Sequence, residues 1–204
     1  MANYEYNGDL PPDINLGSIV AIDTETMGLN PHRDRLCLVQ LSSGDGNAHL
    51  VKVDQSSMKA PVLCSILADS NVLKLFHFGR FDIAVLLHRY KTLTRPVYCT
   101  KIASKLVRTF TNHHGLKNIL QDLLSIDISK QQQSSDWGKE RLTKEQLDYA
   151  ASDVLYLHRI KEELDLILKR ENRQEGAQAC FKFLPYRASL DLLGWPNEDI
   201  FSHS

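Results

Sequence analysis

The sequence predicts an α/β protein in which a mixed central sheet is flanked by helices and followed by a helical C-terminal extension. In the first half of the chain, short apolar runs bounded by turn residues alternate with segments of helical periodicity, whereas the second half is mostly helical in pattern. At 204 residues and 43% hydrophobic composition, the chain can bury a full core. We therefore expect a single domain over residues 1–204, with a core at about 17–170 and an extension at about 171–204.

The expected strands lie mainly in the first half. The apolar run Ile19-Val20-Ala21-Ile22 predicts a buried strand, and Gly28-Leu29-Asn30-Pro31 predicts the turn after it. A later turn, Gly44-Asp45-Gly46-Asn47, predicts a hairpin between two further strands. Together the expected strands cover residues 17–25, 35–42, 49–53, 71–77 and 97–100.

Helices are expected over residues 57–69 and 80–90, and over most of the chain after residue 100. The pair Thr143-x-x-Gln146 forms a capping box, and it predicts the start of a long helix that runs to about residue 172. Before this helix, the polar stretch from Gln131 to Ser135 predicts a loop.

The charge composition is balanced. The chain has 24 Lys and Arg against 25 Asp and Glu, for a net charge of −1. A protein that binds long nucleic-acid duplexes nonspecifically usually has a strong excess of basic residues. If the substrate is a nucleic acid, we expect a short and local contact. Lys130, Lys139, Arg141 and Lys144 surround Trp137 and are candidates for phosphate contact, or simply a solvated face.

No stretch approaches the 18 consecutive apolar residues of a transmembrane helix, and residues 1–13 are polar without the apolar region of a secretory signal. The four cysteines are far apart and form no Cys-x-x-Cys pair. We therefore expect reduced cysteines in a cytoplasmic protein with no membrane contact.

Four acidic residues lie in distinctive short sequence motifs. Asp23 and Glu25 are two apart on an expected strand, so their side chains share a face. Tyr149 and Asp153 are four apart on the long helix and also share a face. Asp82 lies near the start of its helix, where the helix dipole tolerates a negative charge. Three elements can thus bring four carboxylates and one phenol to one point.

Carboxylates that point inward from a buried strand are costly to desolvate unless something positive neutralises them. Their hard oxygens suit Mg²⁺ or Mn²⁺. Two such ions ~3.5–4 Å apart would flank an in-line displacement at phosphorus. The pattern predicts a metal-dependent phosphoryl-transfer site. The alternative for Asp23 and Glu25 alone is a strand end with solvated acids.

The chain resembles the DEDDy class of 3′–5′ exonucleases, which have an RNase H-like fold, in three motifs taken in order: Asp23-x-Glu25, the mid-chain Asp82, and Tyr149-x-x-x-Asp153. The surroundings are similar to the ribonuclease D branch, in Ser135-Asp136-Trp137 and in Arg141-Leu142-Thr143-x-x-Gln146. The resemblance covers roughly residues 17–165. It implies that the four acids are metal ligands and that Tyr149 positions the attacking water.

Ribonuclease D carries helical nucleic-acid-binding domains after its catalytic domain, whereas about 35 residues remain here. The chain therefore looks more like the compact NrnC-type ribonucleases, which degrade very short RNA, down to dinucleotides, and assemble as oligomeric rings. Oligoribonuclease is a functional parallel, although it has a histidine in the place of Tyr149.

The resemblance implies an exoribonuclease that uses two divalent cations, Mg²⁺ or Mn²⁺, and releases nucleoside 5′-monophosphates from short single-stranded RNA. The alternatives are an exonuclease on longer RNA or single-stranded DNA, and a non-catalytic nucleic-acid-binding protein. The second is disfavoured because all four carboxylates and Tyr149 are present.

Residues beside these motifs are candidates for substrate binding. In related enzymes a leucine that follows the acidic pair wedges between the terminal bases, and Leu29 stands in the corresponding place; the alternative is a turn residue packed on the core. Phe78 offers a ring that can stack on a base, but we expect Phe78 and Phe81 to belong to the core, because they flank a strand end and open an amphipathic helix. The full set of candidates is Thr24, Met27, Gly28, Leu29, His77, Phe78 and Trp137. For His77 the alternative is a hydrogen-bonded strand end, and for Trp137 a packing anchor.

The segment from Ala179 to Trp195 is more apolar than one terminal helix needs. Docking on its own domain is one explanation, and a subunit interface is the other. We favour the interface, in a homo-oligomer that could be a ring, because a short and charge-neutral exonuclease needs some other way to shape its substrate channel.

Overall fold

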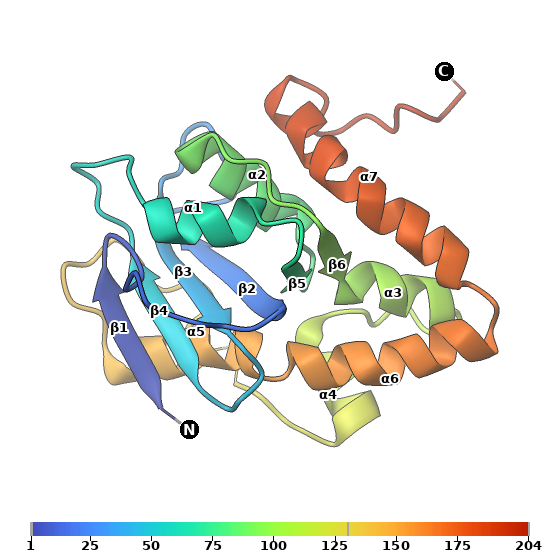
Figure 1. Ribbon diagram of the computed structural model, residues 1–204. Coiled ribbons are helices and arrows are strands. Elements are labelled where there is room, and N and C mark those ends of the chain that lie inside the picture. Colours follow the sequence, from blue (N-terminus) through green and yellow to red (C-terminus); the bar gives the residue numbers. More distant parts are fainter. Residues whose placement is uncertain (1, 130, 204) are drawn as a thin grey trace.

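The structure is a computed structural model, and it describes residues 2–129 and 131–203 (Figure 1). Its centre is one six-stranded sheet with the strand order β1-β4-β3-β2-β5-β6. The sheet is mixed, as expected, because β2 pairs antiparallel with β3 and parallel with β5. The strands are β1 (Asn3–Asn7), β2 (Ile19–Thr26), β3 (Leu36–Ser42), β4 (Ala48–Lys52), β5 (Leu73–Phe76) and β6 (Val97–Cys99).

Helices cover both faces of this sheet. Helices α1 (Pro61–Ala68) and α2 (Arg80–Tyr90) lie on one face, and α5 (Lys144–Leu155) lies on the other (Figure 1). The remaining helices gather beyond the β6 edge: α3 (Thr100–Val107), α4 (Leu116–Leu124), α6 (Leu157–Arg170) and α7 (Gln174–Leu192). The carboxyl ends of the parallel strands β2, β5 and β6 therefore meet between the two groups of helices, where α/β proteins place their sites.

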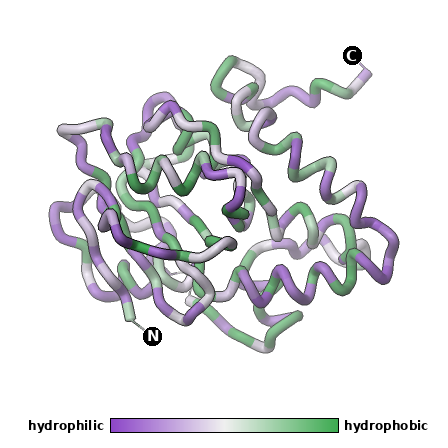
Figure 2. The backbone as a smooth tube through the Cα atoms, in the orientation of Figure 1, coloured by the Kyte–Doolittle hydropathy of each residue, from purple (hydrophilic) through white to green (hydrophobic). Residues whose placement is uncertain are grey.

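The core is built on the central strands. Val20, Ala21 and Ile22 of β2 are fully buried, and every residue of β3 is buried. Figure 2 shows hydrophobic residues along these strands, whereas hydrophilic residues recur along α6 and α7. Strand β2 is thus fixed by apolar packing on both faces, which gives the acidic residues at its end a rigid support.

The first strand was not expected. Strand β1 pairs in parallel with β4, from Asn3 opposite Ala48 to Asn7 opposite Lys52. Its sequence, Asn-Tyr-Glu-Tyr-Asn, is polar because it forms a half-exposed edge, so it lacks the apolar run that marks a buried strand. After it, Asp9 accepts hydrogen bonds from the backbone N–H groups of Val62 and Leu63, at 2.8 and 2.9 Å, and so caps α1.

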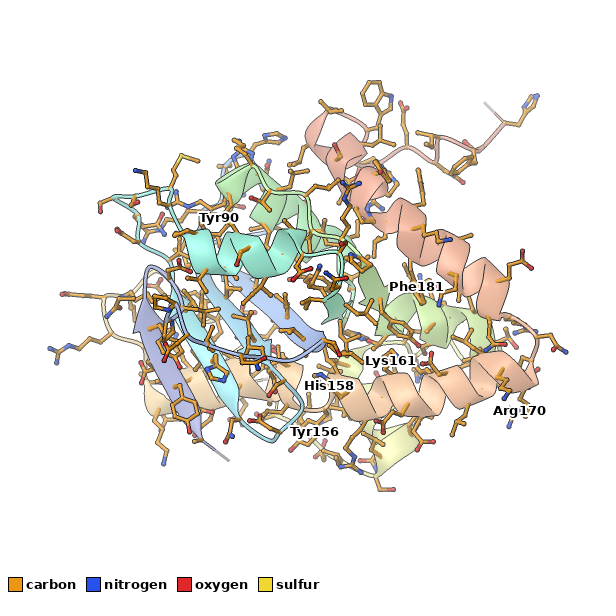
Figure 3. All side chains as sticks on the ribbon, in the orientation of Figure 1. Tyr90, Tyr156, His158, Lys161, Arg170 and Phe181 are labelled. Atoms are coloured by element: carbon orange, nitrogen blue, oxygen red, sulfur yellow. The ribbon has the colours of Figure 1, made fainter. Side chains whose placement is uncertain are left out.

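The expected long helix over 143–172 is in fact two helices, so this expectation was wrong at one residue. Tyr156, with φ −110° and ψ −2°, is a turn residue that separates α5 from α6. The reason is tertiary: α5 packs on β2, β3 and β4, whereas α6 packs on α3 and α4. His158, in the first turn of α6, has its ring nitrogen Nε2 3.0 Å from the carbonyl oxygen of Ile19 (Figure 3).

Other expectations are confirmed. The capping box forms, with Gln146 N–H donating to Thr143 Oγ1 and Thr143 N–H donating to Gln146 Oε1. The stretch from Gln131 to Ser135 is neither helix nor strand. The four cysteines, Cys37, Cys64, Cys99 and Cys180, are free thiols. None of the helices in the described part of the chain has the length and apolar character that crossing a bilayer requires.

Helix α7 docks on its own domain along one face, mainly against α2 and β6. Phe181 is buried, and its ring centroid lies 4.4 Å from that of Tyr98. Apolar side chains near its end stay exposed: Tyr186 of α7 is 50% exposed, and Leu193 and Trp195, which follow the helix, are 67% and 43% exposed. Docking therefore accounts for only part of the apolar content of this segment.

Candidate active site

The first two acids lie at the carboxyl end of β2. Asp23 stands opposite Gln40 and Glu25 opposite Leu38 of β3, so both carboxylates project from the same face of the strand. The register shifts at Glu25 and Thr26, where a bulge turns the chain into the segment before β3. Because the strand before this point is fully buried, its packing fixes the direction of both side chains.

Helix α5 brings the third acid to the same face. Its capping box fixes where the helix begins, and α5 then packs against β2, so that Asp153 faces the strand end. In the described part of the chain, carboxylate oxygens of Asp23, Glu25 and Asp153 lie within 4.8 Å of one another. The strand and the helix thus bring these three acids together, as the sequence analysis expected.

Asp82 reaches the site from the opposite face of the sheet. It lies in the first turn of α2, is 4% exposed, and accepts a 2.6 Å hydrogen bond from the hydroxyl of Thr24. Thr24 stands between Asp23 and Glu25 and so projects from the other side of the strand. Its side chain therefore holds Asp82 against the strand, a role that the sequence analysis did not assign to it.

The acids raise the proton affinity of one another. Burial and then the charges of Asp82, Asp153 and Glu25 hold the pKa of Asp23 well above its usual range. Burial and the charges of Asp153 and Asp82 raise the pKa of Glu25 to about 9. Burial also raises the pKa of Asp82 to about 7, against the lowering effect of its hydrogen bond with Thr24.

Tyr149 lies one helical turn before Asp153. Burial, and then the nearby negative charge of Asp153, raise the pKa of its phenol. The hydroxyl is therefore neutral at physiological pH and cannot serve as a base. It can orient a neighbouring water through hydrogen bonds.

This donor set fits a hard divalent cation. The ligand atoms are carboxylate oxygens, and their charged form is unfavourable in this pocket unless a positive ion is added. Asp23, Glu25 and Asp153 would hold such an ion directly, and Asp82 is placed to contribute from the other side of β2.

The acids line a cavity of about 650 Å³, which also takes in every candidate substrate residue of the sequence analysis. Leu29 is 84% exposed, which excludes the reading that it packs on the core. Phe78 is 49% exposed, so the expectation of a core role for it was wrong. Its positive φ of 65° directs the chain out of β5 and leaves the ring at the cavity wall, whereas Phe81 packs against the core.

Two other candidates are held within the protein. The His77 ring nitrogen Nδ1 lies 2.9 Å from the hydroxyl of Thr100, as expected for a hydrogen-bonded strand end. Trp137 is 3% exposed, and its ring centroid lies 6.0 Å from that of Tyr149. The side chain of Gln146 donates to Ser135 Oγ and to the carbonyl of Asp136, and so ties the Trp137 loop to α5. Trp137 therefore packs against the ring of Tyr149.

The cavity is also lined by two lysine side chains that the sequence analysis missed. Lys101, at the start of α3, lies with its ammonium 4.2 Å from the centroid of the Phe78 ring, and Lys117 lies in α4. Of the basic residues that were candidates for phosphate contact or a solvated face, Arg141 lines a different cavity at the β1–β4 edge, and Lys130 lies outside the described residues. The position of Lys101 could have been inferred from the topology. Lys101 follows β6, which pairs in parallel with β5, and the carboxyl ends of neighbouring parallel strands lie at the same edge of the sheet.

Comparisons with known proteins agree with this geometry. A family model described as 3′-5′ exonuclease matches residues 12–169. Ribonuclease D of Granulibacter bethesdensis is 35% identical over 154 residues, and ribonuclease D of Haemophilus influenzae is 34% identical over 142 residues. These matches cover 76% and 69% of this chain but 38% and 34% of the relatives, so the chain spans little more than a third of their length.

Solved structures extend the likeness to the whole chain. Brucella melitensis NrnC bound to pGG is 56% identical with a TM-score of 0.97, and the same protein with bound Mg²⁺ is 55% identical with a TM-score of 0.96. Both matches cover 100% of each chain. Escherichia coli RNase D, described as an exoribonuclease involved in structured RNA processing, is 25% identical over 84% of this chain, with a TM-score of 0.72.

Membership of one family therefore explains the sequence motifs, the sheet and the close approach of the acids. The chain belongs to the 3′–5′ exonuclease family, as a DEDDy-type member similar to ribonuclease D and, over its full length, to NrnC.

Proposed function

We propose that this protein is a divalent-metal-dependent 3′–5′ exoribonuclease that hydrolyses short RNA, down to dinucleotides, to nucleoside 5′-monophosphates. The observation that carries the proposal is the approach of Asp23, Glu25 and Asp153 within 4.8 Å, next to Tyr149. The likeness to an NrnC bound to pGG supports the short substrate. The balanced charge agrees with it, because a short substrate has few phosphates to neutralise.

Asp23, Glu25, Asp82 and Asp153 would hold two cations, Mg²⁺ or Mn²⁺. Two such ions, when bound, lower the pKa of a water, neutralise the scissile phosphate and stabilise the departing 3′ oxygen. Tyr149 is the residue that orients the attacking water. Its neutral hydroxyl hydrogen-bonds Asp153 and keeps lone pairs for a second partner, so it fixes the direction of the water without accepting its proton.

Exposed apolar side chains would hold the bases. Leu29 would act as a wedge between two bases, since it is exposed and lines the same cavity as the acids, with Met27 and Gly28 next to it. Phe78 offers one open ring face for stacking, a contact worth ~1–3 kcal/mol per base. Lys101 and Lys117 supply positive charge to the same cavity. A volume of about 650 Å³ lies in the range of pockets that enclose a small ligand.

The proposal also covers domain organisation, localisation and assembly. Residues 1–204 would act as one cytoplasmic domain with a core at about 17–170 and an extension at about 171–204. The exposed apolar side chains of Tyr186 on α7 and of Leu193 and Trp195 after it would join copies of the chain into a homo-oligomer.

A length series of 5′-labelled RNA, from two to about twenty nucleotides at fixed Mg²⁺, tests the function. We expect the highest kcat/KM on the dinucleotide, loss of turnover in EDTA, recovery with Mg²⁺ or Mn²⁺, and no turnover by Asp153→Asn. Equal rates at all lengths would end the short-substrate proposal but leave the exonuclease. Turnover by Asp153→Asn or in EDTA would contradict the metal site. A parallel series of DNA tests the sugar selectivity.

A further inference from the structure

The C-terminal extension is joined to the catalytic centre by one compact ion network. Arg80, the first residue of α2, donates two hydrogen bonds to the carboxylate of Asp191 near the end of α7, with Nε to Oδ2 at 2.6 Å and Nη2 to Oδ1 at 2.7 Å. Asp82 lies two residues after Arg80 on the same helical turn. A segment 111 residues after Arg80 in the sequence is thus fixed next to a proposed metal ligand.

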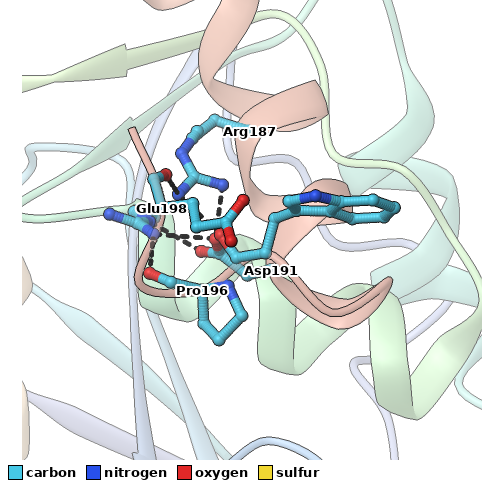
Figure 4. A network of polar contacts seen from close by, with 6 residues as sticks. Arg187, Asp191, Pro196 and Glu198 are labelled. Carbon is cyan, nitrogen blue, oxygen red and sulfur yellow. Dashed lines mark hydrogen bonds and ion pairs between the residues drawn. The ribbon is translucent and has the colours of Figure 1, made fainter. Parts of the chain in front are cut away.

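The network is built as a clamp around Asp191 (Figure 4). Arg187, one helical turn earlier, places Nη1 2.7 Å from Oδ1 of Asp191, so two guanidinium groups share one carboxylate. Arg80 also donates to the carbonyl of Pro196, and Arg187 donates to the carbonyls of Trp195 and Glu198. The side chains of Asp191 and Arg187 are only 14% and 15% exposed, so solvent screens this pairing less than it screens a surface ion pair.

The start of α2 needs such an anchor. Its N-cap residue is Gly79, which has no side chain to cap the helix, and Phe78 before it has the unfavourable φ of 65°. A Cβ atom at Gly79 would lie 2.5 Å from the side chain of Phe76, so the turn is also too tight for another residue. The first turn of α2 therefore has no side-chain N-cap, and the contacts of Arg80 with Asp191 hold it from outside the helix.

We propose that Arg80 and Asp191 are positioning residues through which the C-terminal extension sets the place of Asp82 in the metal site. The proposal rests on the metal site of the proposed function. Asp82 is held at two points, by Thr24 from the strand and by the Arg80–Asp191 clamp from the helix. If the clamp is released, the first turn of α2 can shift, and the carboxylate of Asp82 shifts with it. The affinity of the site for its cations then falls, although no residue of the extension touches them.

The test is calorimetric titration of the full-length protein with Mn²⁺ in the absence of RNA. Asp191→Asn keeps the shape of the side chain but removes the charge shared by the two guanidinium groups. We expect its dissociation constant for Mn²⁺ to rise by about tenfold or more, which is the usual effect of partners that orient metal ligands. The matched control is Asp165→Asn on α6, which removes a carboxylate that accepts from Lys161 Nζ and from the Tyr98 hydroxyl. We expect the control to bind Mn²⁺ as the wild type does.

Wild-type Mn²⁺ affinity in a folded Asp191→Asn variant would overturn the proposal. If that variant is unfolded at the temperature of the titration, Arg80→Lys decides instead, since it keeps the positive charge but cannot form the paired contact. We expect a smaller but measurable loss of affinity for Arg80→Lys, and an unchanged affinity would overturn the proposal. Because the titration uses no RNA, a protein that binds Mn²⁺ but cleaves no RNA would refute the proposed function and leave this inference standing.

Discussion

Asp191 and the acids at the end of β2 both lie next to residues of the first turn of α2, and they are in opposite electrostatic situations. Asp191 is held between the guanidinium groups of Arg80 and Arg187, at 2.6 to 2.7 Å. For Asp23 and Glu25, burial and then the charges of other carboxylates raise the pKa instead. The first arrangement stabilises the fold by itself. The second costs stability until a cation is bound, and proteins retain such an arrangement where it serves a function.

The largest expected difference between the two groups is in Asp→Asn substitutions. Asp23→Asn should lower kcat/KM on a dinucleotide by roughly 10³-fold or more, since a metal ligand contributes more than the ~10–100-fold of a residue that orients one. In EDTA the same variant should melt at a higher temperature than the wild type, because the amide needs no proton to be neutral. Asp191→Asn should melt at a lower temperature, because it leaves two partly buried guanidinium groups without their carboxylate.

Thermal melts of both variants in EDTA, with kcat/KM measured at saturating Mg²⁺, check these opposite signs. A lower melting temperature for Asp23→Asn would show that the acids at the end of β2 are not in mutual repulsion.

The next effect concerns the contact that joins the two faces of β2. Thr24→Val removes the hydroxyl that donates to Asp82 and keeps the shape of the side chain. We expect kcat/KM to fall by about 10–100-fold, as for other partners that orient metal ligands. Steady-state rates on a dinucleotide measure this.

A matched control for Thr24→Val is Thr94→Val. Thr94 is also buried, and its hydroxyl has no hydrogen-bond partner among the described residues. The control should keep wild-type activity and equal or higher stability. Equal losses in the two variants would mean that Thr24 acts only by filling space.

The smallest effect is in the pH dependence of stability without metal. The folded protein holds a proton on Glu25 up to about pH 9, whereas a free glutamate has a pKa of 4.5. The folded state thus binds more protons, so this group adds stability below pH 4.5 that is lost progressively as the pH rises to 9. The melting temperature of the wild type, relative to that of Glu25→Gln, should therefore fall with rising pH in EDTA.

The comparison with Glu25→Gln is needed because burial lowers the pKa of His49, His88 and His114, which changes stability with the opposite sign in both proteins. Saturating Mg²⁺ should reduce the difference between the two proteins, since a cation takes the place of the proton. A difference that does not change with pH would contradict the raised pKa of Glu25.

Much of the site was readable from the sequence. Spacing of two on a strand and of four on a helix places side chains on one face whatever the rest of the protein does. Asp23, Glu25 and Asp153 were assigned in this way, and they meet within 4.8 Å. The capping box before Tyr149 is equally local, because it needs only two side chains and the backbone between them.

Other features depend on distant partners and gave no local signal. Strand β1 is polar and becomes a strand only by pairing with β4. The break at Tyr156 arises because α5 and α6 pack on different neighbours. Phe78 has an apolar side chain of the kind usually found in the core, but the turn at the end of β5 exposes its ring.

By itself the sequence determined the identity and the local geometry of the acidic residues, since helical and strand periodicity are properties of the backbone. Only the tertiary structure decided that Asp82 approaches from the opposite face of β2, that Thr24 holds it, and that Arg80 joins it to Asp191. These contacts span 58 and 111 residues of sequence, and their geometry depends on how the helices pack around the sheet rather than on any pattern along the chain.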